Sequence, residues 1–251
     1  MPQIKPKQYE FVSLIYDELM KDVDYEDWAK YIVKIASKHL KKVKLKVLEL
    51  SSGNCRLASI LSHYYPDIIV SDLSYFMLKR SLKNKLTKVC CDMTMLPFRS
   101  KYDLIFSTFD SVNYLLTKRK LLTLFNETKK ILDPSGIFTF DASLESNSLE
   151  FQESYISDGK CDGYEFKRKS KYSSNTRIHK NIFDFLDDSG RRFREIHKQK
   201  IYRFETYFNL IEKAGMYVVD CFETFTLKDG NSDSERVQFV LKTDSSYADI
   251  S

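Results

Sequence analysis

Along the first 142 residues, apolar positions either recur at helical spacing or form the short runs typical of buried strands. After Asp24, a suitable N-terminal cap, four apolar residues recur at helical spacing and predict an amphipathic helix: Trp28, Tyr31, Ile32 and Ile35. Short apolar runs predict buried strands at 47–50, 68–70, 89–91, 102–109 and 137–140, with helices between them. The last of these helices spans 118–132, and Pro134 and Gly136 terminate it. This alternation implies right-handed crossovers and a parallel, doubly wound α/β sheet.

The pattern changes after about Ser148. Residues 164–172, 178–186 and 191–201 read as extended segments, and the Asp-Asp-Ser-Gly turn at 187–190 predicts a hairpin between the last two. A helix at 205–214 ends at Gly215, and two strands at 217–225 and 236–241 follow. We therefore expect an antiparallel insertion between the fifth strand and the last helix.

Composition restricts the class of protein. With 43% hydrophobic residues the chain can bury a core, and no apolar run approaches the ~20 residues that cross a bilayer. Residues 1–9 lack the apolar stretch of a secretory signal, so we expect a soluble, cytoplasmic protein. The five cysteines form no CxxC pair, which favours reduced thiols and no metal site, and we interpret Cys90 and Cys91 as core residues.

Positive charge is concentrated in the predicted insertion. The net charge is +5, and residues 158–205 hold 13 Lys and Arg against 8 Asp and Glu, which accounts for the whole excess. Such a segment could face an acidic substrate or nucleic acid. Because the acids are interspersed among the bases, a solvated sheet face is the alternative.

Acidic residues follow the predicted strands of the sheet. Ligands of open α/β sheets bind beyond the carboxyl ends of the strands, where Glu49, Asp72, Asp92 and Asp110 all fall. A carboxylate after the second strand can accept both ribose hydroxyls of an adenosine, which suits Asp72. Asp92 could read the adenine amino group while the neighbouring Met93 packs on the ring. Taken singly, each acid could equally cap a helix or lie in a solvated turn.

Four stretches resemble the motifs of class I S-adenosylmethionine-dependent methyltransferases. They are Val47 to Ala58 (VLELSSGNCRLA), Val70 to Ser74 (VSDLS) with Met77 and Leu78, Cys91 to Phe98 (CDMTMLPF) and Phe109 to Leu115 (FDSVNYL). The last, together with the opening segment Ile15 to Met20, is similar to a bacterial branch of small-molecule N-methyltransferase-like proteins.

The resemblance implies a fold, a cofactor and a division of the chain. The fold would be a Rossmann-like, doubly wound seven-stranded sheet with an antiparallel β insertion after the fifth strand, and the cofactor would be S-adenosylmethionine. Residues 1–148 would hold the N-terminal helices and the cofactor-binding core. Residues 149–203 would form the insertion as a substrate lid, and residues 204–251 would supply the last helix and the C-terminal hairpin strands.

The resemblance also implies which residues contact the cofactor. They are Tyr16, Glu49, Ser51, Gly53, Asp72, Leu73, Met77, Asp92, Met93, Phe109 and Asp110. The family loop reads acid-x-Gly-x-Gly-x-Gly, but Ser51 and Cys55 occupy its first and third glycine positions. Their side chains would either fill space near the cofactor or strain the backbone. A non-catalytic binding protein with weak or lost cofactor affinity is therefore the alternative function.

Methyl transfer from a sulfonium is an in-line displacement that needs an aligned acceptor, exclusion of water and, for some acceptors, a base. Aromatic residues that could line the methyl pocket are Tyr16, Phe109 and Tyr114, although core packing is the simpler role for each. His197 lies in a stretch that resembles a Glu-x-His-x-x-Arg-x-Tyr motif of the family's insertion. We predict catalytic roles for His197 and Tyr114, against the alternative that a histidine on a charged strand lies at the surface.

The expected function is methyl transfer to a small molecule, more readily to nitrogen than to oxygen or carbon. Arg236 is a further candidate, as an anchor for an acidic substrate. RNA or protein methylation steered by the basic insertion is another hypothesis, but no Asn-Pro-Pro-Tyr or Pro-Cys motif follows the fourth strand, which disfavours nucleic acid. We expect no membrane partner, and the sequence leaves the oligomeric state open.

Overall fold

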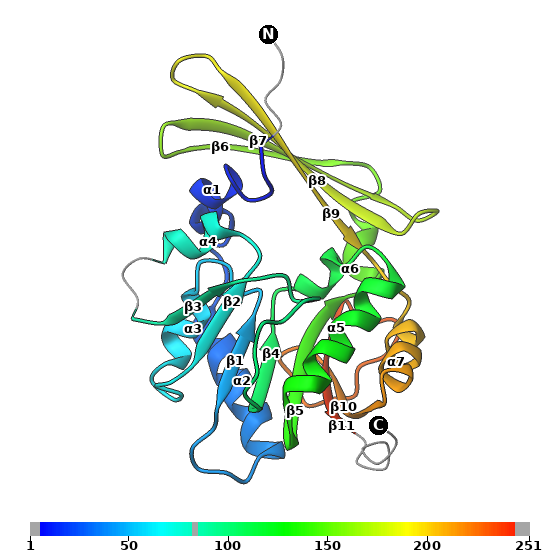
Figure 1. Ribbon diagram of the computed structural model, residues 1–251. Helices are drawn as coiled ribbons and strands as arrows, with labels where there is room; N and C mark the ends of the chain where they lie inside the picture. Colours follow the sequence, from blue (N-terminus) through cyan, green and yellow to red (C-terminus); the bar gives the residue numbers. More distant parts are fainter. Residues whose placement is uncertain (1–5, 82–84, 244–251) are drawn as a thin grey trace.

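Seven strands form the main sheet of the protein. The computed structural model describes residues 6–81 and 85–243. The outer ends of the predicted segments 1–148 and 204–251 therefore lie outside the described residues. The strands are β1 (Val47–Leu50), β2 (Ile69–Asp72), β3 (Thr87–Cys90), β4 (Tyr102–Ser107), β5 (Leu132–Ser143), β10 (Met216–Glu223) and β11 (Arg236–Thr243). Their order across the sheet is β10-β11-β5-β4-β1-β2-β3 (Figure 1).

Strand direction in this sheet is mixed. Strands β3, β2, β1, β4 and β5 pair in parallel, whereas β11 is antiparallel to both β5 and β10. The expected seven-stranded, doubly wound α/β sheet is therefore confirmed, with its first five strands parallel and the C-terminal hairpin strands completing it. No helix separates β10 from β11 along the chain, so the chain returns directly and the two strands pair as a hairpin.

Helices cover both faces of the sheet. On one face, α2 (Tyr25–His39) and α3 (Arg56–Leu61) pack against β1 and β4. On the other face, α5 (Lys118–Ile131) and α7 (Phe204–Lys213) pack against the same strands and against β5 and β11. The predicted cap of α2 is present, because the Asp24 side chain accepts a hydrogen bond of 2.9 Å from the Asp27 amide.

A second, four-stranded antiparallel sheet follows β5 and precedes α7. Its strands are β6 (Tyr155–Cys161), β7 (Tyr164–Ser173), β8 (Ile178–Asp187) and β9 (Arg192–Lys200), reached through the short helix α6 (Ser146–Leu149). This sheet lies above the carboxyl ends of the parallel strands, with α1 (Val12–Leu19) and α4 (Tyr75–Arg80) between the two sheets (Figure 1). The predicted insertion and its hairpin are therefore present, and β6 is an additional strand.

The two faces of the second sheet differ in chemistry. Side chains alternate between faces along β7, β8 and β9, as the strand period requires. The inner face carries phenylalanines at one end, where they pack on α1, and polar residues at the other. The strand lysines alternate onto the outer face, for example Lys167, Lys169 and Lys171, and Arg194 pairs there with Asp184. Of the two interpretations of the basic segment, a solvated face with mixed charge describes this outer surface.

Two further observations concern the sequence expectations. Cys90 is exposed and Cys91 half-buried, so the interpretation of this pair as core residues was wrong, because β3 lies at the edge of the sheet. Among residues 6–81 and 85–243, no helix combines the length and apolar character that crossing a membrane requires.

Candidate functional site

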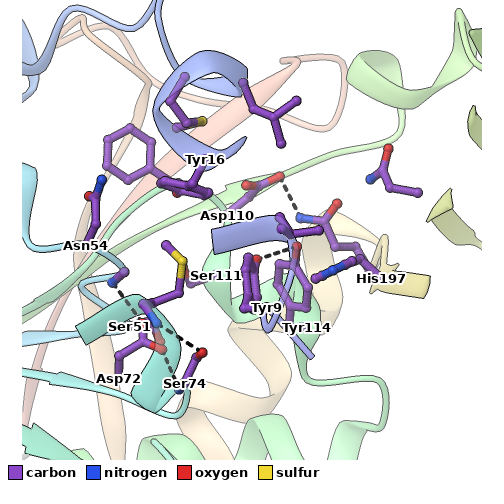
Figure 2. Close-up of a pocket in the computed structure, with 18 of the residues that line it drawn as sticks. Tyr9, Tyr16, Ser51, Asn54, Asp72, Ser74, Asp110, Ser111, Tyr114 and His197 are labelled. Carbon is purple, nitrogen blue, oxygen red and sulfur yellow. Dashed lines mark hydrogen bonds between the residues drawn. The ribbon is translucent and has the colours of Figure 1, made fainter. Parts of the chain in front are cut away.

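A cavity of about 1040 Å³ lies between the carboxyl edge of the seven-stranded sheet and the inner face of the four-stranded sheet (Figure 2). Its walls come from the N-terminal segment and α1, from the loops after β1, β2 and β4, and from β7, β8 and β9. This volume is at the upper end of the roughly 300–1,000 Å³ that small-ligand pockets occupy, so a nucleotide and a small acceptor could fit together.

The loop after β1 retains the backbone path of a glycine-rich loop. Ser51, Gly53 and Cys55 all have φ in the left-handed region, at +56°, +57° and +61°. A Cβ added to Gly53 would lie 3.2 Å from the Met77 Cε atom, so the absence of a side chain there keeps this part of the cavity open. Non-glycine residues pay about 1–2 kcal/mol for this conformation. The loop thus keeps its shape at a cost in strain.

Asp72 closes β2 and connects the two loops. Its Oδ2 accepts a hydrogen bond of 2.8 Å from the Gly53 amide, and its Oδ1 accepts one of 2.7 Å from the Ser74 amide (Figure 2). Burial raises the pKa of Asp72, while the two backbone hydrogen bonds oppose that rise. Each carboxylate oxygen keeps a further lone pair for a ligand hydroxyl.

Asp110 follows β4 in a strained turn and belongs to a charged network. Its Oδ2 accepts a hydrogen bond of 3.1 Å from Gln199 and lies 3.7 Å from Arg236 Nη2, while its backbone amide donates to Asp141 Oδ2 at 2.8 Å. Arg236 also donates to Asp141 Oδ2. Burial raises the pKa of Asp141 to about 6 and also raises that of Asp110, although Arg236 lowers both. Because two carboxylates already surround Arg236, the expectation that it anchors an acidic substrate is not favoured.

Three tyrosines meet at the cavity: Tyr9 and Tyr16 from the N-terminal segment and α1, and Tyr114 from the turn after β4. The Tyr9 hydroxyl donates to the Tyr114 hydroxyl at 2.8 Å, and the Tyr9 and Tyr16 rings meet edge to face with centroids 6.4 Å apart (Figure 2). Burial raises the pKa of Tyr114 to about 12. Burial also raises the pKa of Tyr9. The phenols of Tyr9 and Tyr114 therefore stay protonated near neutral pH and act as hydrogen-bonding walls of the cavity.

His197 lies on the inner face of β9 with only 2% of its surface exposed. Its Nε2 is 3.1 Å from Glu195 Oε2, and its Nδ1 is 3.4 Å from the Gln8 side-chain amide. The alternative that His197 is a surface residue was wrong, because β9 turns it toward the cavity. A carboxylate only accepts, so Nε2 carries the proton and Nδ1 is the basic nitrogen.

Glu195 also fixes the N-terminal segment. Its carboxylate accepts hydrogen bonds from the backbone amides of Tyr9 at 2.8 Å, Val12 at 3.2 Å and Phe11. These amides precede and begin α1, so Glu195 acts as the cap of that helix from another part of the chain. One buried carboxylate thus orients His197 and holds the segment that covers the cavity.

Of the thirteen residues that the sequence predicted for the site, eleven line the cavity. They are Tyr16, Ser51, Gly53, Asp72, Leu73, Met77, Met93, Phe109, Asp110, Tyr114 and His197. Glu49 is buried beneath the loop, and burial raises its pKa well above the usual range. Asp92 lies outside the cavity lining and accepts hydrogen bonds of 2.8 Å from the amide and the hydroxyl of Thr94. The contribution of Glu49 and Asp92 to binding stays a prediction.

Sequence reasoning missed several residues of the cavity. They are Tyr9, Arg168, His179, Asn181 and Gln199. All but Tyr9 lie on the inner face of the second sheet, and the period-two pattern of β7 to β9 could have identified that face once its phenylalanines were assigned to the core. Tyr9 precedes the first predicted element, and no sequence signal singled it out.

Comparison with known proteins finds similarity to methyltransferases. Residues 47–136 match the family model described as a methyltransferase domain. Over 240 residues the chain is 26% identical to the Bacillus subtilis (strain 168) protein named "Putative methyltransferase YqeM", and the match covers 92% of this chain and 95% of that protein.

Two solved structures share the fold over almost the whole length of the chain. An S-adenosylmethionine-dependent methyltransferase from Clostridium acetobutylicum ATCC 824 superposes with a TM-score of 0.78 at 22% identity, covering 94% of this chain and 99% of that one. The sugar N-methyltransferase KedS8 from Streptoalloteichus sp ATCC 53650 superposes with a TM-score of 0.78 at 14% identity, covering 97% of each chain. Residues 47–136 thus match a methyltransferase domain, and the whole chain shares the fold of S-adenosylmethionine-dependent methyltransferases.

The methyltransferase-domain match and the shared fold support S-adenosylmethionine as the cofactor, as the sequence predicted, and the residues present fit it. The open space over Gly53, bounded by Met77 and Tyr16, suits a ligand that packs closely on the loop. The buried Asp72 carboxylate has acceptor capacity for hydroxyl groups, and Met93 lines the same wall. These residues line one cavity at the carboxyl ends of β1, β2 and β3, where ligands of such sheets bind.

Proposed function

We propose that the protein transfers the methyl group of S-adenosylmethionine directly to a nitrogen of a small-molecule acceptor. The observation that carries this proposal is the single cavity that joins the nucleotide-type residues after β1 and β2 to His197 and Tyr114. When bound, S-adenosylmethionine supplies an electrophilic methyl group on a sulfonium centre. The chain supplies alignment, exclusion of water and a proton acceptor.

The cofactor half of the cavity favours positive charge. Asp72 and Asp110 both line it, and Asp110 shares Arg236 with Asp141, so two carboxylates face one guanidinium. Tyr16 and Phe109 line the same cavity, and aromatic faces attract cations by about 0.5–2 kcal/mol. Asp72 would accept the ribose hydroxyls, and Gly53 would let the backbone approach.

The acceptor half contains the proton acceptor. His197 Nδ1 is the basic nitrogen because Glu195 holds the proton on Nε2, and the same carboxylate fixes the ring orientation. In our proposal, Nδ1 takes the proton that an amine loses as it is methylated, with the Gln8 amide displaced from it. Tyr9 and Tyr114, joined by their hydroxyls, exclude water on the side of the N-terminal segment.

Binding of S-adenosylhomocysteine, measured by calorimetry, tests the cofactor assignment. Asp72→Asn should weaken binding at least tenfold, because charge-assisted hydrogen bonds contribute about 1.5–3 kcal/mol. Asp67→Asn, on an exposed aspartate paired with Lys44, is the matched control and should leave the affinity unchanged. If wild-type protein does not bind at millimolar ligand, or if the Asp72 variant binds as well as wild type, the proposal is wrong.

Turnover needs a separate test. Wild-type protein is incubated with methyl-labelled S-adenosylmethionine and pooled small amines, and labelled products are identified by mass spectrometry. His197→Asn should lower kcat strongly while leaving S-adenosylhomocysteine affinity within about twofold, since it changes the proton acceptor and not the nucleotide wall. Equal kcat in both proteins would exclude His197 as the base.

A further inference from the structure

Arg168 on β7 is a cation that faces the cavity without a carboxylate partner. Among the residues that the structure describes, no Asp or Glu forms an ion pair with it, whereas Arg236 contacts two carboxylates and Arg177 pairs with Glu145. The other cations of the cavity wall, Lys7 and Arg56, are exposed to solvent. Desolvation of a guanidinium is costly unless an anion or several hydrogen bonds compensate for it.

The guanidinium is held in a fixed orientation by neutral groups. Arg168 Nε donates to Ser170 Oγ at 3.1 Å and to Asn181 Oδ1 at 3.1 Å, and Nη2 donates to the same Asn181 oxygen at 3.0 Å. Ser170 in turn donates to Asn181 Oδ1 at 2.6 Å. Within the described residues, Nη1 donates no hydrogen bond, and Nη2 keeps one N–H free. The Nη1–Nη2 edge is therefore the edge that remains for a ligand.

A second, independent observation comes from the same face of the sheet, two residues along β8 from Asn181. His179 on β8 lines the same cavity, is only 6% exposed, and its Nε2 has no hydrogen-bond partner in the described part of the chain. Its Nδ1 lies 3.1 Å from Ser148 Oγ, which can donate to it and so leave the ring proton on Nε2. Burial and Arg168 lower the pKa of His179 to about 4, so the ring is neutral. A buried polar atom left unpaired is costly and marks a position where a ligand atom is missing.

Register places these groups next to the proposed base. Asn181 is the direct cross-strand neighbour of both Ser170 on β7 and His197 on β9, and Phe183 is the neighbour of Arg168. The polar half of the inner face thus runs without interruption from Arg168 through Asn181 to His197. An acceptor that reaches His197 would extend toward Arg168.

We propose that Arg168, with His179 and Asn181, forms an oxyanion subsite, and that the methyl acceptor carries a carboxylate or phosphate group bound there. That the bound anion belongs to the methyl acceptor rests on the proposed function, whereas the anion subsite itself does not. A carboxylate or phosphate oxygen pair matches the free guanidinium edge in a bidentate manner. The neutral His179 and the Asn181 amide would donate to the remaining oxygens.

Inorganic phosphate and acetate are the probes, each titrated by calorimetry into wild-type protein with and without saturating S-adenosylhomocysteine. Arg168→Gln should weaken binding of the preferred anion at least tenfold. Lys167→Gln removes the same charge from the adjacent residue on the outer face, and it should change the affinity by less than twofold. Preference for phosphate over acetate, or the reverse, distinguishes the two anion classes.

Arg168→Lys is a second variant that keeps the proposal testable if Arg168→Gln does not fold. Lysine retains the charge but not the bidentate edge, so its affinity should be intermediate. Equal anion affinity in wild type and both Arg168 variants, or an equal loss in Lys167→Gln, would overturn the subsite. Failure of S-adenosylhomocysteine to bind, with anion binding intact and dependent on Arg168, would instead overturn the proposed function alone.

Discussion

Strain in the backbone is concentrated around the cavity. Nine non-glycine residues have positive φ in the described chain, and five of them line the cavity: Tyr9, Ser51, Phe109, Asp110 and Phe225. Such conformations persist only where surrounding contacts fix them, and they are typical of functional sites. The departures from the glycine-rich motif at Ser51 and Cys55 are therefore departures in residue type and not in backbone path.

Ser51→Gly tests this account. Relief of a left-handed serine is worth about 1–2 kcal/mol, and glycine loses about 0.5–1 kcal/mol through its unfolded-state freedom. We expect a net gain near 1 kcal/mol, seen as a rise in melting temperature of roughly 2–4 °C. Ser52→Gly is the control, because Ser52 has ordinary backbone geometry and its hydroxyl donates to the Ser71 carbonyl at 3.1 Å. The control should destabilise the protein, and a loss of stability in both variants would argue against strain at Ser51.

Protonation of His179 should make the stability of the folded protein depend on pH. Its pKa is about 4 in the folded protein and near 6.5 when unfolded, so the unfolded state binds more protons between these values. Its contribution to stability is therefore present above pH 6.5 and is lost as the pH falls toward 4. Chemical denaturation of wild type and His179→Asn should show the wild type losing more stability over this window. Asp141 has a raised pKa and acts in the opposite direction, so the difference between the two proteins is the quantity to compare.

At the scale of elements, the N-terminal helix depends on a residue far along the chain. Glu195→Gln should weaken the hydrogen bonds that hold Tyr9, Phe11 and Val12, because an amide offers one acceptor oxygen and no charge. Hydrogen exchange of these three amides should accelerate by about tenfold or more, on an expected loss near 1.5–3 kcal/mol. Glu165→Gln, on an exposed glutamate of the same sheet, should leave them protected. Unchanged exchange in the Glu195 variant would show that apolar packing alone fixes α1.

The elements of the main sheet could be predicted from sequence because their apolar runs are short and separated by clear helical patterns. Strand β6 could not, since Tyr155 and Ile156 are exposed and the strand contains Gly159. Only the structure gives the reason for that glycine: a Cβ there would lie 2.7 Å from the Phe166 ring. Likewise Arg168 lies within the basic run Lys167 to Lys169, where composition cannot tell which side chain faces the cavity until the strand's faces are known.

At the scale of the whole molecule, one ligand would contact both sheets. Saturating S-adenosylhomocysteine at a hundredfold excess over its Kd should stabilise the protein by about 2.7 kcal/mol. Because Tyr16 and the Asp72 loop share the cavity, hydrogen exchange should slow both in α1 and in the loops after β1 and β2. Protection confined to those loops would mean that the N-terminal helix does not close on the ligand.

The alternation of faces on the second sheet has a consequence for how specificity can change. Phe166 and Arg168 lie two residues apart on one strand, so the ring buried against α1 also determines that the guanidinium, and not its lysine neighbours, points inward. Replacing the outer lysines should therefore leave the cavity wall, and with it the proposed anion subsite, as it is. Loss of the phenylalanine ring, by contrast, should loosen the register and weaken anion binding at the proposed subsite, although the ring does not line the cavity.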